Sequence, residues 1–338
     1  MKRNFKKVMS FLLLTSLLLT LIACGGGGKD DQSSGGDTGE SKEYKVAMIT
    51  NAPIADGGWN TSAYNAMVAA AEAEGFETTY TENVAQTDYV TTIREYANLG
   101  YNLVFAPGNE FTDAVHEVAK DFPDTKFAIL NGDTHGDNIA SLLPNNKEIG
   151  FIAGALAGLQ TETNSVGFVG GMEITPTVTM MEYYEKGAKF VNPDVQVSTA
   201  MANSYDDTAK GKEIAASMVS TNNVDVFYGH ASAIDAGVRE GIRDMENRWS
   251  IAQPDDFLDD DPKVILTSIV TSNTEMLKIA MQEVKNNEYG NKIIEGSLEN
   301  SVVTIGRFGE SAKEEAKTKF NEIVENIKAG TFDIDNPQ

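Results

Sequence analysis

A regular alternation of short apolar runs with longer helical stretches begins at Tyr44 and constrains the fold of this chain more than any other feature. Strands separated by helices of about 10–15 residues are typical of parallel βαβ units. The alternation restarts at Ser165, after a Gly- and Ala-rich helix predicted over 150–162. The pattern therefore predicts two similar α/β lobes.

The predicted elements also indicate how the chain connects the two lobes. Strands are expected over 45–50, 77–84, 103–107, 126–130, 165–170, 195–203, 225–229, 250–253, 264–270 and 301–305. Helices are expected over 61–74, 88–99, 112–121, 150–162, 177–191, 208–220, 231–245, 273–286 and 311–329. Gly75 is the expected C′ residue of the first helix, and Asp207 is the expected N-cap of the helix over 208–220. The last four elements are too few for a third domain, so we expect them to return to the two lobes. A chain that crosses between lobes more than once forms a hinge, and open parallel sheets bind ligands at the carboxyl ends of their strands.

Charge and composition exclude several classes of function. The chain has 338 residues and a net charge of −23, although four of its 27 basic residues lie in the first seven positions. Such an acidic surface repels phosphate backbones, so we expect no nucleic acid as a partner. One cysteine and three histidines make a zinc site improbable, and the sequence has no hydrolase motif. We therefore expect no metal, no cofactor and no enzymatic activity.

The first 43 residues indicate export and attachment to a membrane. The apolar run over 11–22 follows a basic segment and is shorter than the ~20 residues that a spanning helix needs. It ends in Leu21-Ile22-Ala23-Cys24, which resembles a bacterial lipobox; the alternative is an ordinary secretion signal with an incidental cysteine. The resemblance implies a signal peptide over 1–23 and acylation of Cys24, for example by palmitate. Residues 24–43 are predicted to be a flexible tether, and the protein is expected on the extracytoplasmic face of the cell membrane.

Two aromatic residues stand at strand-to-helix turns, one in each predicted lobe. Trp59 follows Asp56-Gly57-Gly58, where the glycines permit a tight turn. Tyr205 occupies the corresponding turn of the second lobe, within 203–207. Trp59 is either a packing residue or a stacking platform for a planar ligand, and the two aromatics together could close on a flat ring.

Polar candidates follow two strands of the second lobe. Asp256 comes after the predicted strand 250–253 and either accepts hydrogen bonds from a ligand or belongs to a solvated acidic loop that continues to Asp261. This loop lacks the spacing of a calcium site. His230 follows the strand 225–229 and either caps the turn or faces a ligand. The glycines within 150–158 match no phosphate-binding pattern and indicate close packing of a helix.

Several motifs, in the same order along the chain, resemble the basic membrane protein family of substrate-binding lipoproteins, which includes purine nucleoside receptors of ABC importers. The motifs that carry the resemblance are DGGWN over 56–60, FTDAV over 111–115, FIAGALAG over 151–158, VGFVGGM over 166–172, NPDV over 192–195, YDDTAKG over 205–211 and LTS over 266–268.

The resemblance implies a type I periplasmic-binding-protein fold with two doubly wound α/β lobes joined by a hinge. Lobe 1 would comprise 44–162 plus 265–295, and lobe 2 would comprise 163–264 plus 296–338. The resemblance also implies that a base is sandwiched between Trp59 and Tyr205, that Asn60 lies beside it, and that Asp256 binds ribose.

The chain departs from the family at several positions of the expected site. Asn51 and Asn131 replace aspartates at the ends of two strands, and Thr271 stands where a lysine is usual. The glycine-rich turn after 225–227 contains Gly229 and His230 instead. These departures change the polar groups around the ligand, so Asn51, Asn131, Gly229 and His230 are predicted to join the binding site.

The predicted function is capture of a purine nucleoside or nucleobase for an ABC importer, with permease and ATPase subunits as partners. One alternative is a surface lipoprotein that senses its ligand without transport. Another is a receptor for a sugar-like small molecule.

Overall fold

The computed structural model describes residues 43–55 and 59–337. The predicted signal peptide, Cys24, all of the tether except Glu43, and the turn residues 56–58 lie outside the described residues. Within these described ranges, none of the helices combines the length and apolar character needed to cross a membrane.

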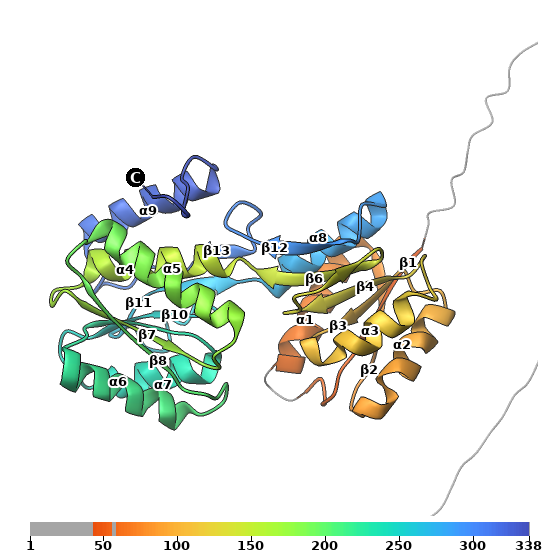
Figure 1. The fold of residues 1–338 in the computed structure, drawn as a ribbon, viewed down its shortest axis with the longest axis horizontal. Helices are drawn as coiled ribbons and strands as arrows, with labels where there is room; N and C mark the ends of the chain where they lie inside the picture. The colour runs from red at the N-terminus through yellow and green to blue at the C-terminus, as the bar shows by residue number, and fades with distance from the viewer. Residues whose placement is uncertain (1–42, 56–58, 338) are drawn as a thin grey trace, which may run out of the picture. The chain divides into compact units, whose positions relative to one another are not determined.

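The first lobe is built on a seven-stranded sheet in the order β12-β6-β4-β3-β1-β2, with the short strand β5 paired to β6 (Figure 1). All of its strand pairs are parallel except β5–β6. The strands are β1 (Tyr44–Ile49), β2 (Phe76–Thr81), β3 (Leu103–Ala106), β4 (Lys126–Leu130), β5 (His135–Gly136), β6 (Ile139–Pro144) and β12 (Lys292–Gly296). The helices are α1 (Trp59–Glu74), η1 (Gln86–Asp88), α2 (Tyr89–Asn98), η2 (Asn109–Phe111), α3 (Thr112–Ala119) and α8 (Asn273–Asn286).

The second lobe is built on a six-stranded sheet in the order β13-β11-β10-β9-β7-β8, in which only β13 is antiparallel. The strands are β7 (Ser165–Gly170), β8 (Gln196–Met201), β9 (Val226–Gly229), β10 (Trp249–Ala252), β11 (Ile265–Thr271) and β13 (Val303–Ile305). The helices are α4 (Asn146–Gln160), α5 (Thr175–Val191), α6 (Thr208–Asn222), α7 (Ser232–Ile242) and α9 (Glu314–Lys328).

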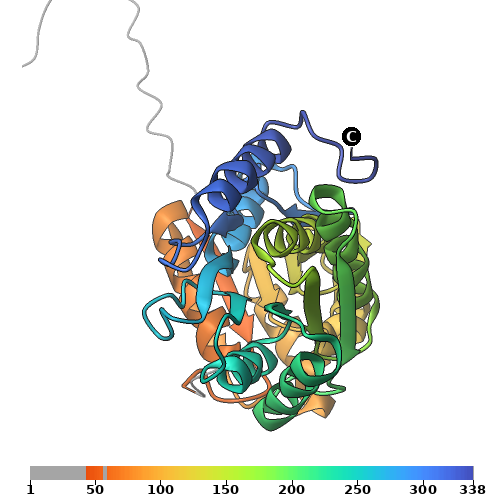
Figure 2. The same cartoon turned by 90° about the vertical axis from the view of Figure 1, so that its left-hand side faces the viewer.

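Each sheet has a hydrophobic core on both faces, which is the arrangement of a doubly wound fold. In the first lobe, α1 and α8 contribute to one core and α2 and α3 to the other. In the second lobe, α4, α5 and α9 contribute to one core and α6 and α7 to the other. Figure 2 shows α9 beside α4, in agreement with their contacts. Burial on both faces explains why strands such as β3 (LVFA) are continuously apolar and fully buried.

The glycines of α4 allow this helix to approach α5 at backbone distance. A Cβ atom placed on Gly154 would lie 1.9 Å from the carbonyl oxygen of Tyr184, and one on Gly150 would lie 2.2 Å from that of Met180. Gly187 of α5 has the same relation to α4, because its Cβ would lie 2.0 Å from a backbone oxygen there. The close helix packing predicted from the glycine pattern is therefore confirmed.

The chain passes between the two sheets three times, from β6 to α4, from β11 to α8 and from β12 to β13. The crossing segments are hydrogen-bonded to one another. The backbone N–H of Asn145 donates to the carbonyl of Gly296 at 2.7 Å, and that of Ser272 donates to the carbonyl of Val302 at 2.8 Å. The predicted return of the last four elements to the two lobes is confirmed.

Two segments lie in a different lobe from the one to which the sequence assigned them. Helix α4 was expected to end lobe 1, but it packs against α5 and α9 because its glycine face fits α5. Strand β11 was also grouped with lobe 1, but it pairs with β10. Its first five residues are buried and would fit either sheet, so the sequence alone does not say which sheet it joins. The rest of the predicted division of the chain into lobe 1 and lobe 2 stays a prediction.

Three strands of the first sheet were not predicted, namely β5, β6 and β12. The chain reaches β6 from β4 through a turn that contains β5 and no helix, so the βα alternation gives no signal there. Strand β12 (KIIEG) carries charges at two of its five positions and lacks a strand pattern. The predicted caps are confirmed: Gly75 has a left-handed φ of 73°, and the Asp207 side chain accepts a hydrogen bond from the backbone N–H of Lys210 at 2.9 Å.

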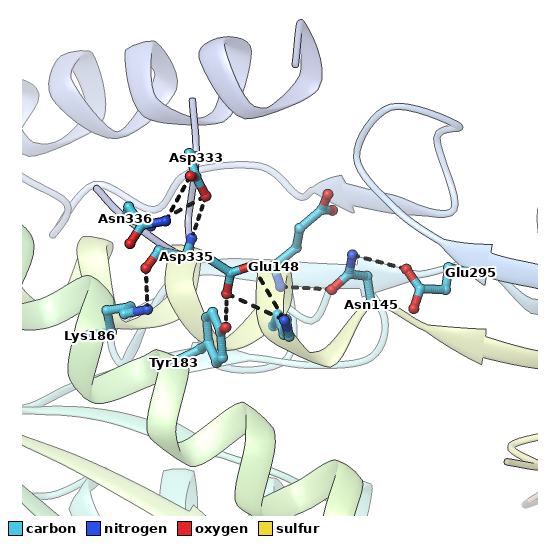
Figure 3. Close-up of polar contacts among 9 residues, drawn as sticks. Asn145, Glu148, Tyr183, Lys186, Glu295, Asp333, Asp335 and Asn336 are labelled. Atoms are coloured by element: carbon cyan, nitrogen blue, oxygen red, sulfur yellow. Dashed lines mark hydrogen bonds and ion pairs between the residues drawn. The ribbon is translucent and has the colours of Figure 1, made fainter. Parts of the chain in front are cut away.

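The C-terminal segment after α9 is fastened to α4 and α5 (Figure 3). Asp335 accepts a hydrogen bond from the Tyr183 hydroxyl and lies 3.3 Å from Lys147 Nζ. Lys186 Nζ donates to the Asp335 carbonyl at 2.8 Å, and Asp333 accepts from the backbone N–H of Asp335. Exposed pairs of this kind contribute little individually, so their role is to hold the end of the chain in one position.

Candidate functional site

Of the eight residues predicted to bind a ligand, Gly229 ends strand β9 and the other seven lie in segments that follow the carboxyl ends of strands. In the first lobe these residues are Asn51, Trp59, Asn60 and Asn131, and in the second lobe they are Tyr205, Gly229, His230 and Asp256. Parallel strands place their carboxyl ends at one edge of a sheet, so each set occupies one edge of its own sheet.

Trp59 is the first residue of α1 and is 41% exposed. Its indole Nε1 donates a hydrogen bond to the carbonyl oxygen of Pro107, just after β3, at 2.5 Å. This bond ties the ring to the neighbouring strand end and leaves much of its surface open. A large exposed aromatic that is held in position in this way is suited to stacking on a flat ligand.

A second contact joins the ends of β1 and β3. The side-chain amide Nδ2 of Asn51 donates to the carboxylate Oε1 of Glu110 at 3.0 Å. The negative charge of Glu110 contributes, after burial, to raising the pKa of Tyr89. A carboxylate therefore does lie beside Asn51, although it comes from η2 rather than from the strand end where the family has its aspartate.

The two other asparagines of the first lobe differ in exposure. Asn60 is 7% exposed within the first turn of α1. Asn131 follows β4 with an exposed side chain and a left-handed φ of 56°, and its backbone N–H donates to the carbonyl of Leu142 at 2.8 Å. Asparagine tolerates this conformation better than most residues, so Asn131 also has a backbone role.

Tyr205 lies in the turn between β8 and α6 and is 51% exposed. Its ring covers Gly171, where an added Cβ would lie 3.1 Å from the Tyr205 Cδ1 atom. Burial on that side raises the pKa of its hydroxyl. Among the described residues, no ring contact joins Tyr205 to Trp59, so the predicted sandwich of the two aromatics stays a prediction.

The turn after β9 is tightly packed and strained. An added Cβ at Gly229 would lie 2.6 Å from the Cα of Asp235 in α7. The backbone N–H of His230 donates to the carbonyl of Val169 at 2.8 Å, and burial lowers the pKa of its imidazole to about 4. Ala231 has φ 81° and ψ 131°, a conformation that residues other than glycine rarely adopt. Such strain is common where a turn positions functional groups.

A buried ion pair lies directly beneath this turn. Arg239 Nε donates to Asp235 Oδ2 at 3.0 Å, and both side chains are almost completely buried. Burial raises the pKa of Asp235 to about 7, against the opposing effect of Arg239 and of a hydrogen bond from the Gln253 backbone. The Arg239 guanidinium also lies 5.0 Å from the ring centre of Phe257. The pair therefore supports the loop that carries Asp256.

Asp256 is held by Arg307, which comes from the segment after β13. Arg307 Nε donates to Asp256 Oδ2 at 2.8 Å, and its NH2 group lies 2.9 Å from Asp259 Oδ2. The hydrogen bond from Arg307 lowers the pKa of Asp256, which keeps this carboxylate ionised. Asp261 pairs with Arg243 at 2.7 Å, so three carboxylates of the acidic loop form ion pairs. No three His, Cys, Asp or Glu residues gather as a metal site within the described ranges.

Three features of this site were not found from the sequence. Glu110 and Arg307 lie 59 and 51 residues from their partners Asn51 and Asp256, and no local pattern connects such distant positions. The Asp235–Arg239 pair did have a local signal, because its i, i+4 spacing falls within a predicted helix.

Two depressions in the described surface lie elsewhere in the first lobe. One, of about 220 Å³, is lined by residues of α3 and of the turn before β6, including His116 and Asp137. The other, of about 300 Å³, is lined by Ala97 and by residues 100–102 and 121–125, which precede β3 and β4. The second depression therefore lies at the amino ends of the strands, where parallel sheets seldom bind ligands.

Comparison with known proteins shows to which family this chain belongs. The model of the family described as "ABC transporter substrate-binding protein PnrA-like" matches residues 43–336. The chain is 28% identical to the CD4+ T-cell-stimulating antigen of Listeria monocytogenes, over 87% of this chain and 88% of that protein. It is also 28% identical to the ABC transporter nucleoside-binding protein BmpA of Lactococcus lactis, over 80% and 84%. The identity to a purine-binding protein of Brucella abortus is 28%, over 70% and 67%.

Solved structures confirm the type I periplasmic-binding-protein fold. A transcriptional activator of the comK gene from Bacillus halodurans has a TM-score of 0.74 at 22% identity, over 84% of this chain and 97% of that one. An ABC transporter solute-binding protein from Aeropyrum pernix has a TM-score of 0.69 at 19% identity, over 86% and 92%. The chain belongs to the PnrA-like family of ABC transporter substrate-binding proteins, whose members bind solutes rather than catalyse reactions.

Proposed function

We propose that this protein captures a purine nucleoside or nucleobase between Trp59 and Tyr205 and delivers it to an ABC permease. The observation that carries the proposal is that Trp59 and Tyr205, one from each lobe, are large exposed aromatics that follow the carboxyl ends of strands of their own sheets. The names of the Lactococcus and Brucella relatives, which refer to nucleoside and purine binding, support the same class of ligand. The three crossings between the lobes supply a hinge on which the two aromatics close.

We further propose that Asp256 accepts hydrogen bonds from the ribose hydroxyls. Within the described ranges, its Oδ1 atom accepts one hydrogen bond, from the backbone N–H of Leu258 at 3.2 Å, while Oδ2 is bound by Arg307. An ionised carboxylate oxygen has more than one lone pair to offer, so Oδ1 can still accept a hydroxyl. Arg307 fixes the carboxylate and supplies a positive charge in a site where the usual lysine is replaced by Thr271.

Calorimetry of the Asp256→Asn variant tests this assignment. The variant is expected to bind inosine and adenosine roughly ten- to a hundredfold more weakly, because hydrogen bonds to a charged acceptor contribute about 1.5–3 kcal/mol. Hypoxanthine, which has no ribose, is expected to bind the variant and the wild type equally. Asp259→Asn is the matched control, since it removes the other partner of Arg307 and leaves Asp256 intact. Equal losses for inosine and hypoxanthine would contradict the ribose role, and tight binding of free ribose alone would favour a sugar receptor.

We also propose that Cys24 carries the lipid anchor of the mature protein. The Cys24→Ala variant is expected to be released from the membrane fraction or to stay unprocessed, because Cys24 is the only cysteine of the chain. Metabolic labelling with a palmitate analogue measures this directly. Cys24→Ser is a conservative comparison, and continued labelling of either variant would show that the lipid is attached elsewhere.

A further inference from the structure

The carboxylate of Glu110 is open to solvent and can accept more hydrogen bonds than it receives. Glu110 lies in η2, just after the carboxyl end of β3, and both Glu110 and its partner Asn51 are exposed. The Oε1 atom accepts from Asn51 Nδ2 at 3.0 Å, and within the described ranges the Oε2 atom accepts no hydrogen bond. A ligand that reaches this open surface therefore meets a charged oxygen with free lone pairs.

The backbone over 107–110 places this carboxylate next to the proposed stacking platform. The carbonyl of Pro107 holds the indole of Trp59, and Gly108 is the next residue. A Cβ atom added at Gly108 would lie 2.1 Å from Oε2 of Glu110, so the carboxylate lies over the backbone of Gly108. Because consecutive Cα atoms are about 3.8 Å apart, the anchor of the indole and the carboxylate are close neighbours. A ring stacked on Trp59 can therefore present its edge to Glu110.

The side chain of Glu110 is held in this position by its surroundings. Phe111, the next residue, is 1% exposed, and its ring centre lies 4.3 Å from that of Tyr89. The Asn51 amide fixes one carboxylate oxygen. Gly108 has an extended φ of 169° that any residue adopts, so what its missing side chain provides is room for the carboxylate. A side chain that is already positioned loses less conformational entropy when it binds a ligand.

The acceptors of Glu110 match a ring edge that carries two adjacent N–H groups. Oε2 can accept one of them and the remaining lone pair of Oε1 the other, as in the paired hydrogen bonds between a carboxylate and an arginine. Guanine presents such an edge, with an amino group beside a ring N–H. Hypoxanthine has the ring N–H alone. Adenine has an unprotonated ring nitrogen at this place, and its lone pair would be repelled by the carboxylate.

We propose that Glu110 is a specificity-determining residue, which binds the amino group and the ring N–H of a guanine-type base stacked on Trp59. This inference rests on the proposed function and narrows its ligand to bases that carry an amino group beside a ring N–H. Glu110 supplies the negative charge here, because Asn51 at the end of β1 is neutral. The role is separate from that of Asp256, which concerns the sugar.

Calorimetry of the Glu110→Gln variant with guanosine, inosine and purine riboside tests the proposal. Glutamine keeps an oxygen for the Asn51 amide but loses the charge and one acceptor. Its affinity for guanosine is expected to fall roughly ten- to a hundredfold, and its affinity for inosine is expected to fall less. Purine riboside has neither N–H group and is expected to bind unchanged. Glu117→Gln is the matched control, because it removes another exposed carboxylate of the same lobe, on α3, and should leave guanosine binding at the wild-type level.

The Gly108→Ala variant moves the carboxylate without changing its chemistry. The three atoms nearest to the added methyl group all belong to the end of the Glu110 side chain, which can swing away. The melting temperature without ligand is therefore expected to stay at the wild-type value, while the affinity for guanosine falls as in Glu110→Gln. Purine riboside is again expected to bind unchanged.

The outcomes separate this inference from the proposed function. Unchanged guanosine affinity in Glu110→Gln would overturn the inference and leave the proposed function intact. Equal losses for guanosine and purine riboside would also overturn it, because Glu110 would then not act on the N–H edge. A lower melting temperature without any change in guanosine affinity would assign Glu110 a structural role instead. Failure of the wild type to bind any nucleoside or base would overturn the proposed function and this inference with it.

Discussion

Replacement of Trp59 by alanine is expected to weaken nucleoside binding by roughly ten- to a hundredfold. The estimate follows from the ~1–3 kcal/mol that stacking of a base on a protein aromatic contributes. Trp59 is suited to this role because it is 41% exposed and is held in place by its hydrogen bond to Pro107. Calorimetry with inosine measures the effect.

The Trp59→Phe variant separates stacking from the hydrogen bond. Phenylalanine cannot donate to the Pro107 carbonyl but keeps an aromatic face, so a small loss is expected if stacking dominates. Tyr101→Ala is a control at the amino end of β3, where an aromatic is removed away from the site. If Trp59→Phe lost as much affinity as Trp59→Ala, the indole hydrogen bond rather than the ring face would be the important contact.

Replacement of Gly154 by alanine is expected to lower the free energy of unfolding by about 3 kcal/mol. The new methyl group would lie 1.9 Å from the backbone oxygen of Tyr184, and a backbone atom cannot move aside without shifting α5. Overpacking of a core typically costs about 1–3 kcal/mol and sometimes more. Alanine also has a higher helix propensity than glycine, and this gain of about 1 kcal/mol offsets part of the cost of the clash. Urea unfolding of the two-lobed part of the protein measures the change in the free energy of unfolding.

Two further glycines make this prediction a graded series. Gly187→Ala should be similarly destabilising, because its Cβ would lie 2.0 Å from the oxygen of Phe151. Gly158→Ala should cost less, because its nearest contacts lie at 2.7 Å and one of them is the Val191 side chain. The gain in helix propensity is the same for all three variants, so differences between their free energies of unfolding report the clash alone. Equal stability of the three variants would mean that α4 and α5 separate easily.

The sequence by itself determined the parts of the molecule that depend on neighbouring residues. The alternation of apolar runs with helices predicted two parallel α/β lobes, because strands buried on both faces are continuously apolar, as in β3. Gly75 and Asp207 marked helix ends, because the backbone geometry of a cap needs particular residues at fixed positions. Trp59 and Tyr205 were placed at strand-to-helix turns because each stands between a predicted strand and the next predicted helix.

Only the tertiary structure decided which distant residues meet. Strand β6 was missed because no helix precedes it, and β11 was assigned to the other lobe because an apolar run fits either sheet. The contacts of Glu110 with Asn51 and of Arg307 with Asp256 join positions more than 50 residues apart. The first exists because the parallel strands β1 and β3 end at one edge of their sheet, and the second because the antiparallel strand β13 runs back beside β11. The burial of His230 and Asp235 likewise depends on how α7 packs against the turn after β9, and it leaves no mark on the order of residues.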